Sequence, residues 1–298
     1  MSRNISIKWT DPGNQGMRLR QNGQVPFLTF PILEELPWLI HGFSTRLGGV
    51  SSGPCATMNL DPAREQNREN VEENLRRMGG ALGFTTEHLV RTFQSHTDHV
   101  AVVNRNDCNC AGNRRTDLRD TDGLITGDPY AVLMVFVADC VPVLLADPVN
   151  RVIAAVHSGW RGTEKKITAT AVRKMQEEFH SDPKDILAGI GPSICRDCYE
   201  VGEDVAEAFR SACPKDQWDS ILLPGRKEGK FQLDLWEANR INLEAAGILP
   251  EHIQTGGLCT CCNPELLFSH RASGGKRGTL AGFIGFRQDE KSTYSSYS

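Results

Sequence analysis

The sequence predicts one α+β domain, an α/β-layered arrangement of mixed β-sheets flanked by helices. Three near-continuous apolar segments lie in the middle of the chain, and such segments are typical of strands covered on both faces. Segments with the periodicity of amphipathic helices surround them along the chain. No internal repeat and no Pro/Gly-rich linker divides the 298 residues, which are enough for one large core.

The N-terminal segment, residues 1–40, is predicted to be peripheral to the main domain. It contains two short strand-like pieces, at 5–10 and 25–30. The segment that follows, 41–60, is rich in turns, because its paired glycines and its proline exclude a long helix.

A charged helix is predicted over residues 62–79, because Asp61 can serve as its N-cap and Pro62 as its first helical residue. The next segment, 88–104, has the pattern of a strand, a polar interruption and a second strand. An irregular loop follows at 104–121, and it carries Cys108 and Cys110.

The middle of the chain gives the clearest pattern. An amphipathic helix is predicted over 163–179, with Thr163 as its cap and Glu164 in its first turn. The apolar strands that precede this helix are predicted at 131–138, 141–146 and 152–157.

The last third of the chain alternates strands with helices. Gly247 is a typical C-cap residue and ends the second helix. The strands are predicted at 185–191, 252–257 and 278–287, the helices near 203–213 and at 233–246, and a frayed tail at 288–298.

Composition excludes several function classes. The formal net charge is −4, so the chain has no strong basic field for nucleic acid or an anionic membrane. The N-terminus has no signal-peptide pattern and no apolar stretch is long enough to span a bilayer, so we expect a cytoplasmic protein. In that compartment most of the ten cysteines would be reduced thiols, some of them at a metal or catalytic centre.

The residues His96, Cys140 and His157 lie where strand-like segments end or break. One thiolate and two imidazoles are a natural donor set for Zn²⁺. Three protein ligands would leave one coordination position for water or substrate, as in catalytic zinc sites. Two other interpretations stay open: these side chains are ordinary core residues, or Cys140 is a nucleophile with a histidine as its base.

Two arginines lie in glycine-containing turns near these candidates. Arg46 precedes a pair of glycines, and Arg161 lies four residues after His157. Guanidinium groups bind phosphate or carboxylate, so both are candidate anion ligands, although a single arginine is more often a surface residue. A basic segment near the C-terminus is interpreted as a flap over an anionic ligand or as a solvated face, and it holds His270, Arg271, Lys276 and Arg277.

The C-terminal half is rich in cysteine. It contains one C-x-x-C motif and, about sixty residues later, the sequence CTCC, read as C-x-C-C. A structural zinc or redox chemistry would fit, but reduced thiols near a loop-rich surface are the favoured interpretation. The cysteines concerned are Cys195, Cys198, Cys259, Cys261 and Cys262.

Several motifs together resemble the YfiH family, also called the multicopper polyphenol oxidoreductase or laccase-domain family. The motifs occur in order from about residue 41 to 287, which we take as the catalytic domain: HGFSTRLGGVSSGPCATMNL, QSHTDHV, DGLIT, ADCVPVLLADP, AVHSGWRGT, GPSICRDCYEVGEDV, FQLDLWEANRINL and CTCCNPELLFSHRASGGKRG. One departure is Thr97, where family members often have glycine.

The resemblance implies a layered fold grouped with a cytotoxic-factor cysteine-hydrolase fold. It also implies a zinc bound by His96, Cys140 and His157. The implied activity is zinc-dependent phosphorolysis of adenosine, inosine and methylthioadenosine, together with deamination of adenosine. The implied partners are a small-molecule nucleoside and phosphate, with no nucleic acid and no membrane, and we expect a monomer.

On this reading we hypothesise roles for further residues. Asp139 would shuttle protons, Arg46 would hold phosphate, and Asn59 would orient phosphate or ribose hydroxyls. Arg161 would bind substrate or lock the loop behind His157. Asp98 or Asp122 would fix the tautomer of an imidazole.

Alternative functions stay open from the sequence. They are a copper-dependent polyphenol oxidase, a Cys140/His157 cysteine hydrolase, an editing enzyme for peptidoglycan precursors, and a non-catalytic binding module. The sequence lacks the paired-histidine motifs of multicopper sites, which argues against the oxidase.

Overall fold

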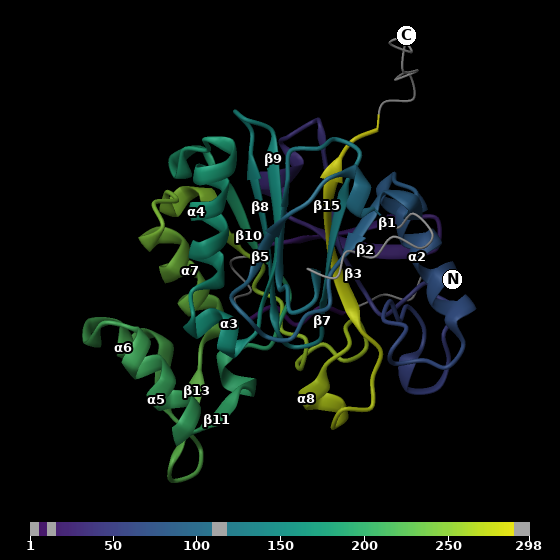
Figure 1. Cartoon of the computed structure of the whole chain (residues 1–298). Coiled ribbons are helices and arrows are strands. Elements are labelled where there is room, and N and C mark those ends of the chain that lie inside the picture. The colour runs from purple at the N-terminus through teal and green to yellow at the C-terminus, as the bar shows by residue number, and fades with distance from the viewer. Residues whose placement is uncertain (1–5, 11–15, 109–117, 289–298) are drawn as a thin grey trace.

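Two six-stranded sheets form the centre of the protein (Figure 1). The computed structural model describes residues 6–10, 16–108 and 118–288. The first sheet has the strand order β1 (Arg18–Asn22), β2 (Val25–Thr29), β3 (Leu39–Ser44), β15 (Leu280–Phe286), β7 (Val132–Val137), β4 (Leu89–Arg91). The second has the order β14 (Ile253–Thr255), β10 (Leu187–Ile190), β8 (Val141–Asp147), β9 (Val152–Ser158), β6 (Gly123–Thr126), β5 (Val100–Val102).

Helices cover the outer faces of both sheets, and a small third sheet extends from one end. The third sheet has the order β11 (Glu200–Gly202), β13 (Lys230–Leu233), β12 (Leu222–Pro224). The helices are α1 (Pro31–Glu34), α2 (Arg68–Leu82), α3 (Trp160–Glu164), α4 (Ile167–Phe179), α5 (Glu203–Ala212), α6 (Trp218–Ile221), α7 (Leu235–Ala245) and α8 (His270–Ser273).

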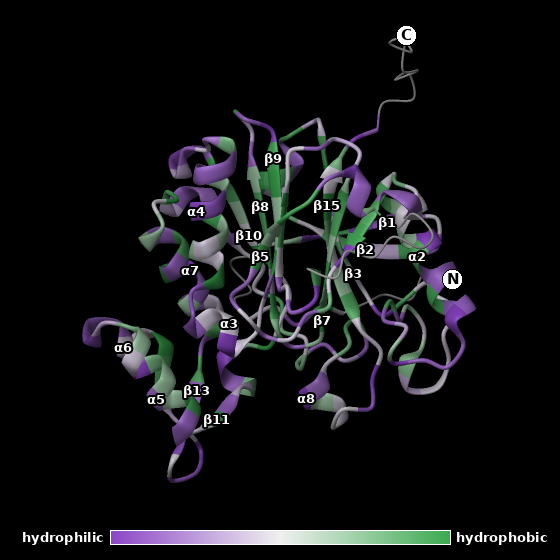
Figure 2. Cartoon of the chain, viewed as in Figure 1, coloured by the Kyte–Doolittle hydropathy of each residue, from purple (hydrophilic) through white to green (hydrophobic). Residues whose placement is uncertain are grey.

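The core lies in three layers, as hydrophobic clusters show. One cluster fills the space between the sheets, where β7 contacts β9 and β15 contacts β8. A second lies between the second sheet and helices α4, α5 and α7, and a third between the first sheet and α2. The central strands are therefore apolar on both faces, as Figure 2 shows by hydropathy, and the predicted layered α+β class is confirmed.

The chain crosses between the two sheets at one end of the sandwich. Strand β7 belongs to the first sheet and β8 to the second, and only residues 138–140 join them. Strands β4 and β5 also belong to different sheets, and residues 92–99 join them. Both connections carry residues that the sequence analysis selected as metal ligands, so the crossings decide where the candidate site forms.

The charged helix begins later than predicted. Residues 62–64 form turns, and α2 begins at Arg68 with Asn67 as its N-cap, whose side chain accepts a hydrogen bond from the Glu69 amide. Asp61 instead caps a local turn by accepting from the amide of Ala63 at 2.9 Å. Several capping residues occur in this stretch, and tertiary packing selects the later one.

The helix predicted over 163–179 is two helices. Helix α3 begins before Thr163, and α4 begins at Ile167. Lys166 separates them in the left-handed region at φ 61°. The apolar periodicity continues through this break, so the sequence pattern does not reveal it.

Within the described part of segment 1–40, β1 and β2 extend the first sheet, and Leu28 and Phe30 are fully buried. The sequence predicts a strand at 5–10, of which the structure describes residues 6–10. These residues form a single β-bridge, from Trp9 to Leu258, and not a strand. Cys110 and tail residues 289–298 lie outside the described residues.

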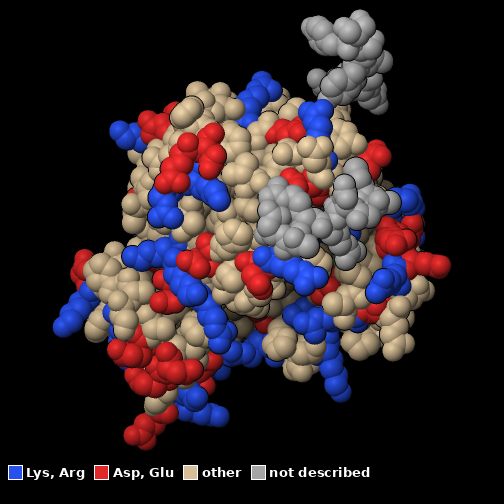
Figure 3. All heavy atoms as spheres, viewed as in Figure 1, with Lys and Arg blue, Asp and Glu red and all other residues tan. Residues whose placement is uncertain are grey.

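Over the face shown in Figure 3, acidic and basic side chains are intermixed. Within the described ranges, no helix is both long and apolar enough to cross a membrane.

Candidate metal centre

Cys140 lies at the crossing from β7 to β8. The preceding residue, Asp139, has φ 88°, so the chain makes a tight turn there before entering β8. Both carboxylate oxygens of Asp139 are held: Thr260 Oγ1 donates to one at 2.6 Å, and the Arg271 amide donates to the other at 2.7 Å. The Asp139 carbonyl also accepts from the Ile194 amide at 3.0 Å. These bonds fix the backbone that presents the Cys140 thiol.

His157 lies on β9, the antiparallel neighbour of β8. Pro142 pairs with His157 in the register, which brings His157 next to the beginning of β8 and to Cys140. His157 Nδ1 lies 2.7 Å from Asp122 Oδ1, and both side chains are buried. Asp122 therefore occupies Nδ1 and leaves Nε2 of His157 for a metal ion.

His96 comes from the second crossing, between β4 and β5. It has φ 66° and is exposed. The amides of Ser95, His96 and Thr97 all donate to the Asp122 carboxylate, and the Thr97 hydroxyl adds a bond at 2.8 Å. One buried carboxylate thus positions both imidazoles. The expectation that Asp98 or Asp122 fixes an imidazole is confirmed for Asp122, whereas Asp98 is exposed and near Lys165.

The three ligand atoms lie together. The donor atoms of His96, Cys140 and His157 are all within 4.8 Å of one another, and His96 Nε2 is 3.7 Å from the Cys140 sulfur. In a tetrahedral zinc site the bond lengths place sulfur and nitrogen about 3.6 Å apart. The donors therefore fit a zinc ion, and the exposure of His96 leaves one side of the group open to solvent.

Gly159 leaves room for this group. A Cβ at this position would lie 2.7 Å from His96 Cδ2 and 3.2 Å from the Cys140 sulfur. Any other residue would therefore push against two of the ligands.

The electrostatics favour a thiolate beside an imidazolium when no metal is bound. Burial alone would raise the pKa of Cys140, but the charge of His157 and hydrogen bonds from both imidazoles lower it to about 6. Burial alone would lower the pKa of His157, but Cys140 and Asp122 raise it to about 9. The hydrogen bonds and charge of His157 outweigh burial at Asp122 and hold its pKa well below the ordinary range.

Two residues predicted to touch substrate have protein partners in the structure. Asn59 is fully buried and donates to the Asp61 carbonyl and to Glu65, while its oxygen accepts from the amides of Asp61 and Thr279. The contact of Asn59 with phosphate or ribose stays a prediction, and it would require one of these bonds to break, because all the hydrogen-bonding groups of its side chain are used.

Arg46 is largely a bracing residue. Its guanidinium donates to the carbonyls of Ala56 and Pro264 and lies over the Phe268 ring, 4.7 Å from its centroid. Its role in binding phosphate stays a prediction.

Other cationic and aromatic groups lie near Cys140. Arg161 is exposed and stacks on Trp160. The partly buried Arg277 donates to the Thr279 hydroxyl at 2.9 Å, and its Nε is buried with no partner. Burial and Arg64 lower the pKa of Arg277, against the opposing effect of Asp139 and Cys140. From the sequence, Arg277 is recognisable only as part of a basic segment.

Tyr199 was missed entirely. The pKa of its phenol is raised well above the ordinary range, mainly by burial and to a smaller extent by the negative charge of Cys140. Arg271 lies over its ring, with 5.4 Å between the guanidinium carbon and the centroid. The only sequence signal for Tyr199 is its place directly after Cys198.

The cysteine-rich segments also converge. Cys195, Cys198, Cys259 and Cys262 have their sulfur atoms within 4.8 Å of one another. Reading CTCC as C-x-C-C overlooked a second C-x-x-C, formed by Cys259 and Cys262. These cysteines are thus a cluster rather than scattered surface thiols.

Comparisons with known proteins show the family of this chain. A family model described as multi-copper polyphenol oxidoreductase laccase matches residues 40–287. Purine nucleoside phosphorylase YlmD of Geobacillus stearothermophilus is 36% identical over 253 residues, covering 84% of this chain and 91% of the relative. A protein from an unknown prokaryotic organism, named adenosine deaminase RL5, is 36% identical over 194 residues, covering 65% and 73%.

A crystal structure of YlmD from Geobacillus stearothermophilus superimposes with a TM-score of 0.83 at 32% identity, over 91% of this chain and 99% of that one. The mouse purine nucleoside phosphorylase LACC1 is 33% identical over 275 residues, 89% of this chain. The chain spans only 59% of the length of that relative.

Proposed function

Because the chain belongs to the multi-copper polyphenol oxidoreductase laccase family, in which relatives are named purine nucleoside phosphorylase and adenosine deaminase, we propose that it is a zinc-dependent purine nucleoside enzyme. Its reactions would be phosphorolysis of adenosine, inosine and methylthioadenosine, and deamination of adenosine. Its partners would then be small molecules, a nucleoside and phosphate.

The observation that carries this proposal is the convergence of His96, Cys140 and His157 with Asp122 behind them. The set has the donors of a catalytic zinc site, a buried carboxylate that orients one imidazole, and an exposed side. When bound there, zinc would act as a Lewis acid and would lower the pKa of a water molecule.

The two reactions make different demands on the chain. In phosphorolysis a phosphate oxygen bonds to C1′ of the ribose, and the bond from C1′ to the purine breaks. The purine leaves with the bonding electrons and takes up a proton. In deamination water replaces the amino group at C6, and ammonia leaves. Phosphorolysis therefore needs a cationic phosphate site, whereas deamination needs proton transfer at the purine.

Cationic side chains near the centre can supply the phosphate site. The Arg161 guanidinium is exposed and, within the described part of the chain, makes no ion pair with a carboxylate. Arg277 has a buried Nε with no partner, and Cys140 and Asp139 influence its pKa. We assign phosphate binding to these two arginines, with Arg46 bracing the loop beside them.

Asp139 supports the site from its turn. Because Thr260 and the Arg271 amide hold both its oxygens, its carboxylate orients the Cys140 backbone, and shuttling protons would require one of these bonds to break. Its role as a proton shuttle stays a prediction.

The test is product analysis with zinc-loaded protein and adenosine, with and without phosphate. Adenine plus ribose 1-phosphate, formed only with phosphate, establishes phosphorolysis, and inosine establishes deamination. Arg161→Ala should impair the phosphate-dependent reaction more than deamination, with Arg173→Ala as an exposed control on α4. No product from any of the three nucleosides, at full zinc occupancy, would refute the proposal.

A cysteine hydrolase is the second candidate, and the lowered pKa of Cys140 beside His157 favours it. Metal-free protein that forms a covalent adduct at Cys140 and turns over an acyl substrate would support it. Copper-dependent phenol oxidation is the activity that the family description names, and a His₂Cys donor set also suits copper. Loading the same protein with copper or with zinc and assaying phenol oxidation and phosphorolysis in parallel separates these two metals.

A further inference from the structure

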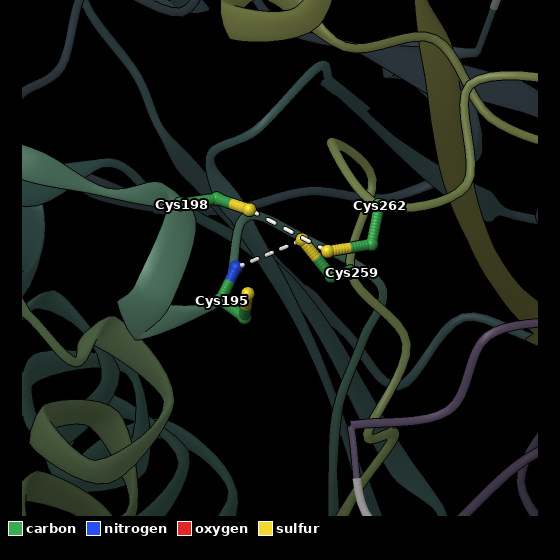
Figure 4. Close-up of side chains that lie close together, drawn as sticks. All are labelled: Cys195, Cys198, Cys259 and Cys262. Atoms are coloured by element: carbon green, nitrogen blue, oxygen red, sulfur yellow. Dashed lines mark hydrogen bonds between the residues drawn. The ribbon is translucent and has the colours of Figure 1, made fainter.

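Four cysteine sulfurs form a second group beside the candidate metal centre (Figure 4). Cys195 and Cys198 lie on the 3₁₀ turn that follows β10, and Cys259 and Cys262 lie on the turn that follows β14. Strands β10 and β14 are parallel neighbours, so the two turns leave the same edge of the sheet side by side. Figure 4 shows the side chains of both turns directed toward one another.

The distances fit a tetrahedral tetrathiolate site. All four sulfurs are within 4.8 Å of one another, and those of Cys198 and Cys262 are 3.4 Å apart. A zinc–sulfur bond of about 2.3 Å places two sulfurs of a tetrahedron about 3.8 Å apart. All four cysteines are free thiols in the structure, so disulfide bonds do not bring the turns together.

The surroundings also suit bound thiolates. The Cys195 amide donates to the Cys259 sulfur at 3.2 Å, and both of these side chains are buried. Such bonds from the backbone stabilise a charged sulfur. Two C-x-x-C pairs are the usual spacing of closed zinc sites in which all four ligands come from protein.

We propose that Cys195, Cys198, Cys259 and Cys262 bind a structural Zn²⁺, distinct from the ion proposed at His96, Cys140 and His157. This site has four protein ligands and no open position, so it would not take substrate. It would tie the turn after β10 to the turn after β14, which are 64 residues apart in sequence.

The structural zinc supports the first centre through Asp139. Thr260, which follows Cys259, donates its hydroxyl to Asp139, and the Ile194 amide, which precedes Cys195, donates to the Asp139 carbonyl. Both turns thus hold the residue that precedes Cys140. Arg271 adds a link, because its amide donates to Asp139 and its guanidinium to the Cys198 carbonyl.

The decisive experiment counts metal in full-length protein prepared under reducing conditions with zinc and then freed of loosely bound ions. We expect two equivalents of zinc per chain in the parent protein. His157→Ala should retain one equivalent, and Cys198→Ser or Cys262→Ser should lose the other. The matched control is Cys261→Ser, because Cys261 lies between two of the ligands in sequence and packs beside the cluster but is not one of its four members, and it should retain both.

X-ray absorption keeps the proposal testable if the cysteine variants fail to fold. The zinc retained by His157→Ala should have four sulfur neighbours at about 2.3 Å and no nitrogen. Three results would each overturn the structural zinc. They are nitrogen neighbours in the absorption spectrum, iron with acid-labile sulfide in the protein, and a protein mass lowered by the loss of thiol hydrogens, which would show disulfides. Absence of any nucleoside turnover would refute the proposed function but would leave the zinc count and its sulfur coordination unchanged, so the two failures are distinguishable.

Discussion

Asp122 is the residue on which the candidate metal centre most depends. It is fully buried, contacts His157 directly and accepts three backbone amides from the loop that carries His96. A carboxylate in this position fixes the imidazole tautomer and increases its basicity toward a metal.

The first prediction concerns Asp122→Asn. The variant keeps the shape of the side chain but loses its charge, so zinc affinity at the His₂Cys centre should fall by about 10- to 100-fold. Competition against a chromogenic chelator measures this. Asp98→Asn is the matched control, because Asp98 is exposed and in the same loop. Equal affinity in both variants would show that Asp122 does not support the ligand.

The second prediction concerns Gly159→Ala. Gly159 has φ −69°, so the backbone tolerates alanine, but the new Cβ would lie 2.7 Å from His96 Cδ2. We expect reduced zinc occupancy and turnover with little change in secondary structure, measured by metal analysis and circular dichroism. Gly80→Ala on α2 is the control, because a Cβ there meets nothing within 4 Å. Full zinc occupancy in Gly159→Ala would contradict the close packing around the ligands.

At the scale of single residues, the sequence indicates side chains whose own chemistry is unusual. It does not indicate side chains whose role depends on the partners that the fold brings to them. His96, Cys140 and His157 could be selected because sulfur and imidazole donors at strand ends are unusual. Asn59 and Arg46 also have suitable chemistry, but backbone groups that only the fold assembles occupy them. Tyr199 gives no local signal, because its environment comes from distant residues.

At the scale of the elements, strands were easier to predict than helix boundaries. Strands β7, β8 and β9 follow the apolar segments closely because both their faces are buried. The break between α3 and α4 was missed, because it depends on the backbone conformation of Lys166 and not on apolar spacing.

The third prediction follows from that break. Lys166 is exposed at φ 61°, a conformation that costs most residues about 1–2 kcal/mol and that asparagine adopts more readily. Lys166→Asn should therefore raise the free energy of unfolding by up to about 1 kcal/mol, measured by urea titration. Lys165→Asn should give no gain, because Lys165 has φ −79°. Similar gains in the free energy of unfolding in both variants would show that the left-handed backbone at residue 166 is not the cause.

The fourth prediction concerns pH and strand β3. Burial lowers the pKa of His41 to about 4, and its neutral Nε2 accepts from the Phe30 amide at 2.9 Å. In the unfolded chain the histidine takes up a proton near its ordinary pKa of 6.5, whereas in the folded chain it does so only near pH 4. The contribution to stability is therefore fully present above pH 6.5 and is lost as the pH falls toward 4, by up to about 3 kcal/mol.

Urea unfolding across this pH range tests the His41 prediction. His41→Gln keeps a hydrogen-bond acceptor but does not titrate. Its free energy of unfolding should therefore fall less than that of the parent as the pH drops, because one proton fewer is taken up on unfolding. His252→Gln serves as a histidine control at a partly exposed site. If the stability of His41→Gln depended on pH as strongly as that of the parent, groups other than His41 would cause the loss of stability in acid.

At the scale of the whole molecule, the layered fold was predictable and the pairing of strands between sheets was not. Apolar periodicity and chain length lead to one α+β domain, and the motifs identify the family that the comparisons confirm. No local pattern indicates that β7 and β8, only three residues apart, belong to different sheets. That crossing brings Cys140 to His157, so the site could be selected by chemistry but not constructed from the sequence.

The two sheets meet around the ring of Phe43, which is 1% exposed. Phe43 is on β3 of the first sheet and pairs with Gly282 of β15. From the second sheet, Gly191 and Pro142 close over the same ring, since a Cβ at Gly191 would lie 2.5 Å from Phe43 Cε1 and 2.8 Å from Pro142 Cγ. Glycine at position 191 therefore sets how closely the sheets approach.

The fifth prediction is that Gly191→Ala forces the sheets apart. Overpacking of a buried contact should lower the free energy of unfolding by about 1–3 kcal/mol in urea titration. Because Pro142 pairs with His157 across β8 and β9, zinc affinity should fall with stability. The double variant Gly191→Ala/Phe43→Leu should recover part of both losses, since the smaller side chain makes room for the methyl group.

The control is Gly80→Ala. Its added methyl is unobstructed in a helix, so it should instead stabilise the protein by about 0.5–1 kcal/mol. If Gly191→Ala were as stable as the parent, or the double variant recovered nothing, Phe43 would not be the contact that couples sheet packing to the metal centre.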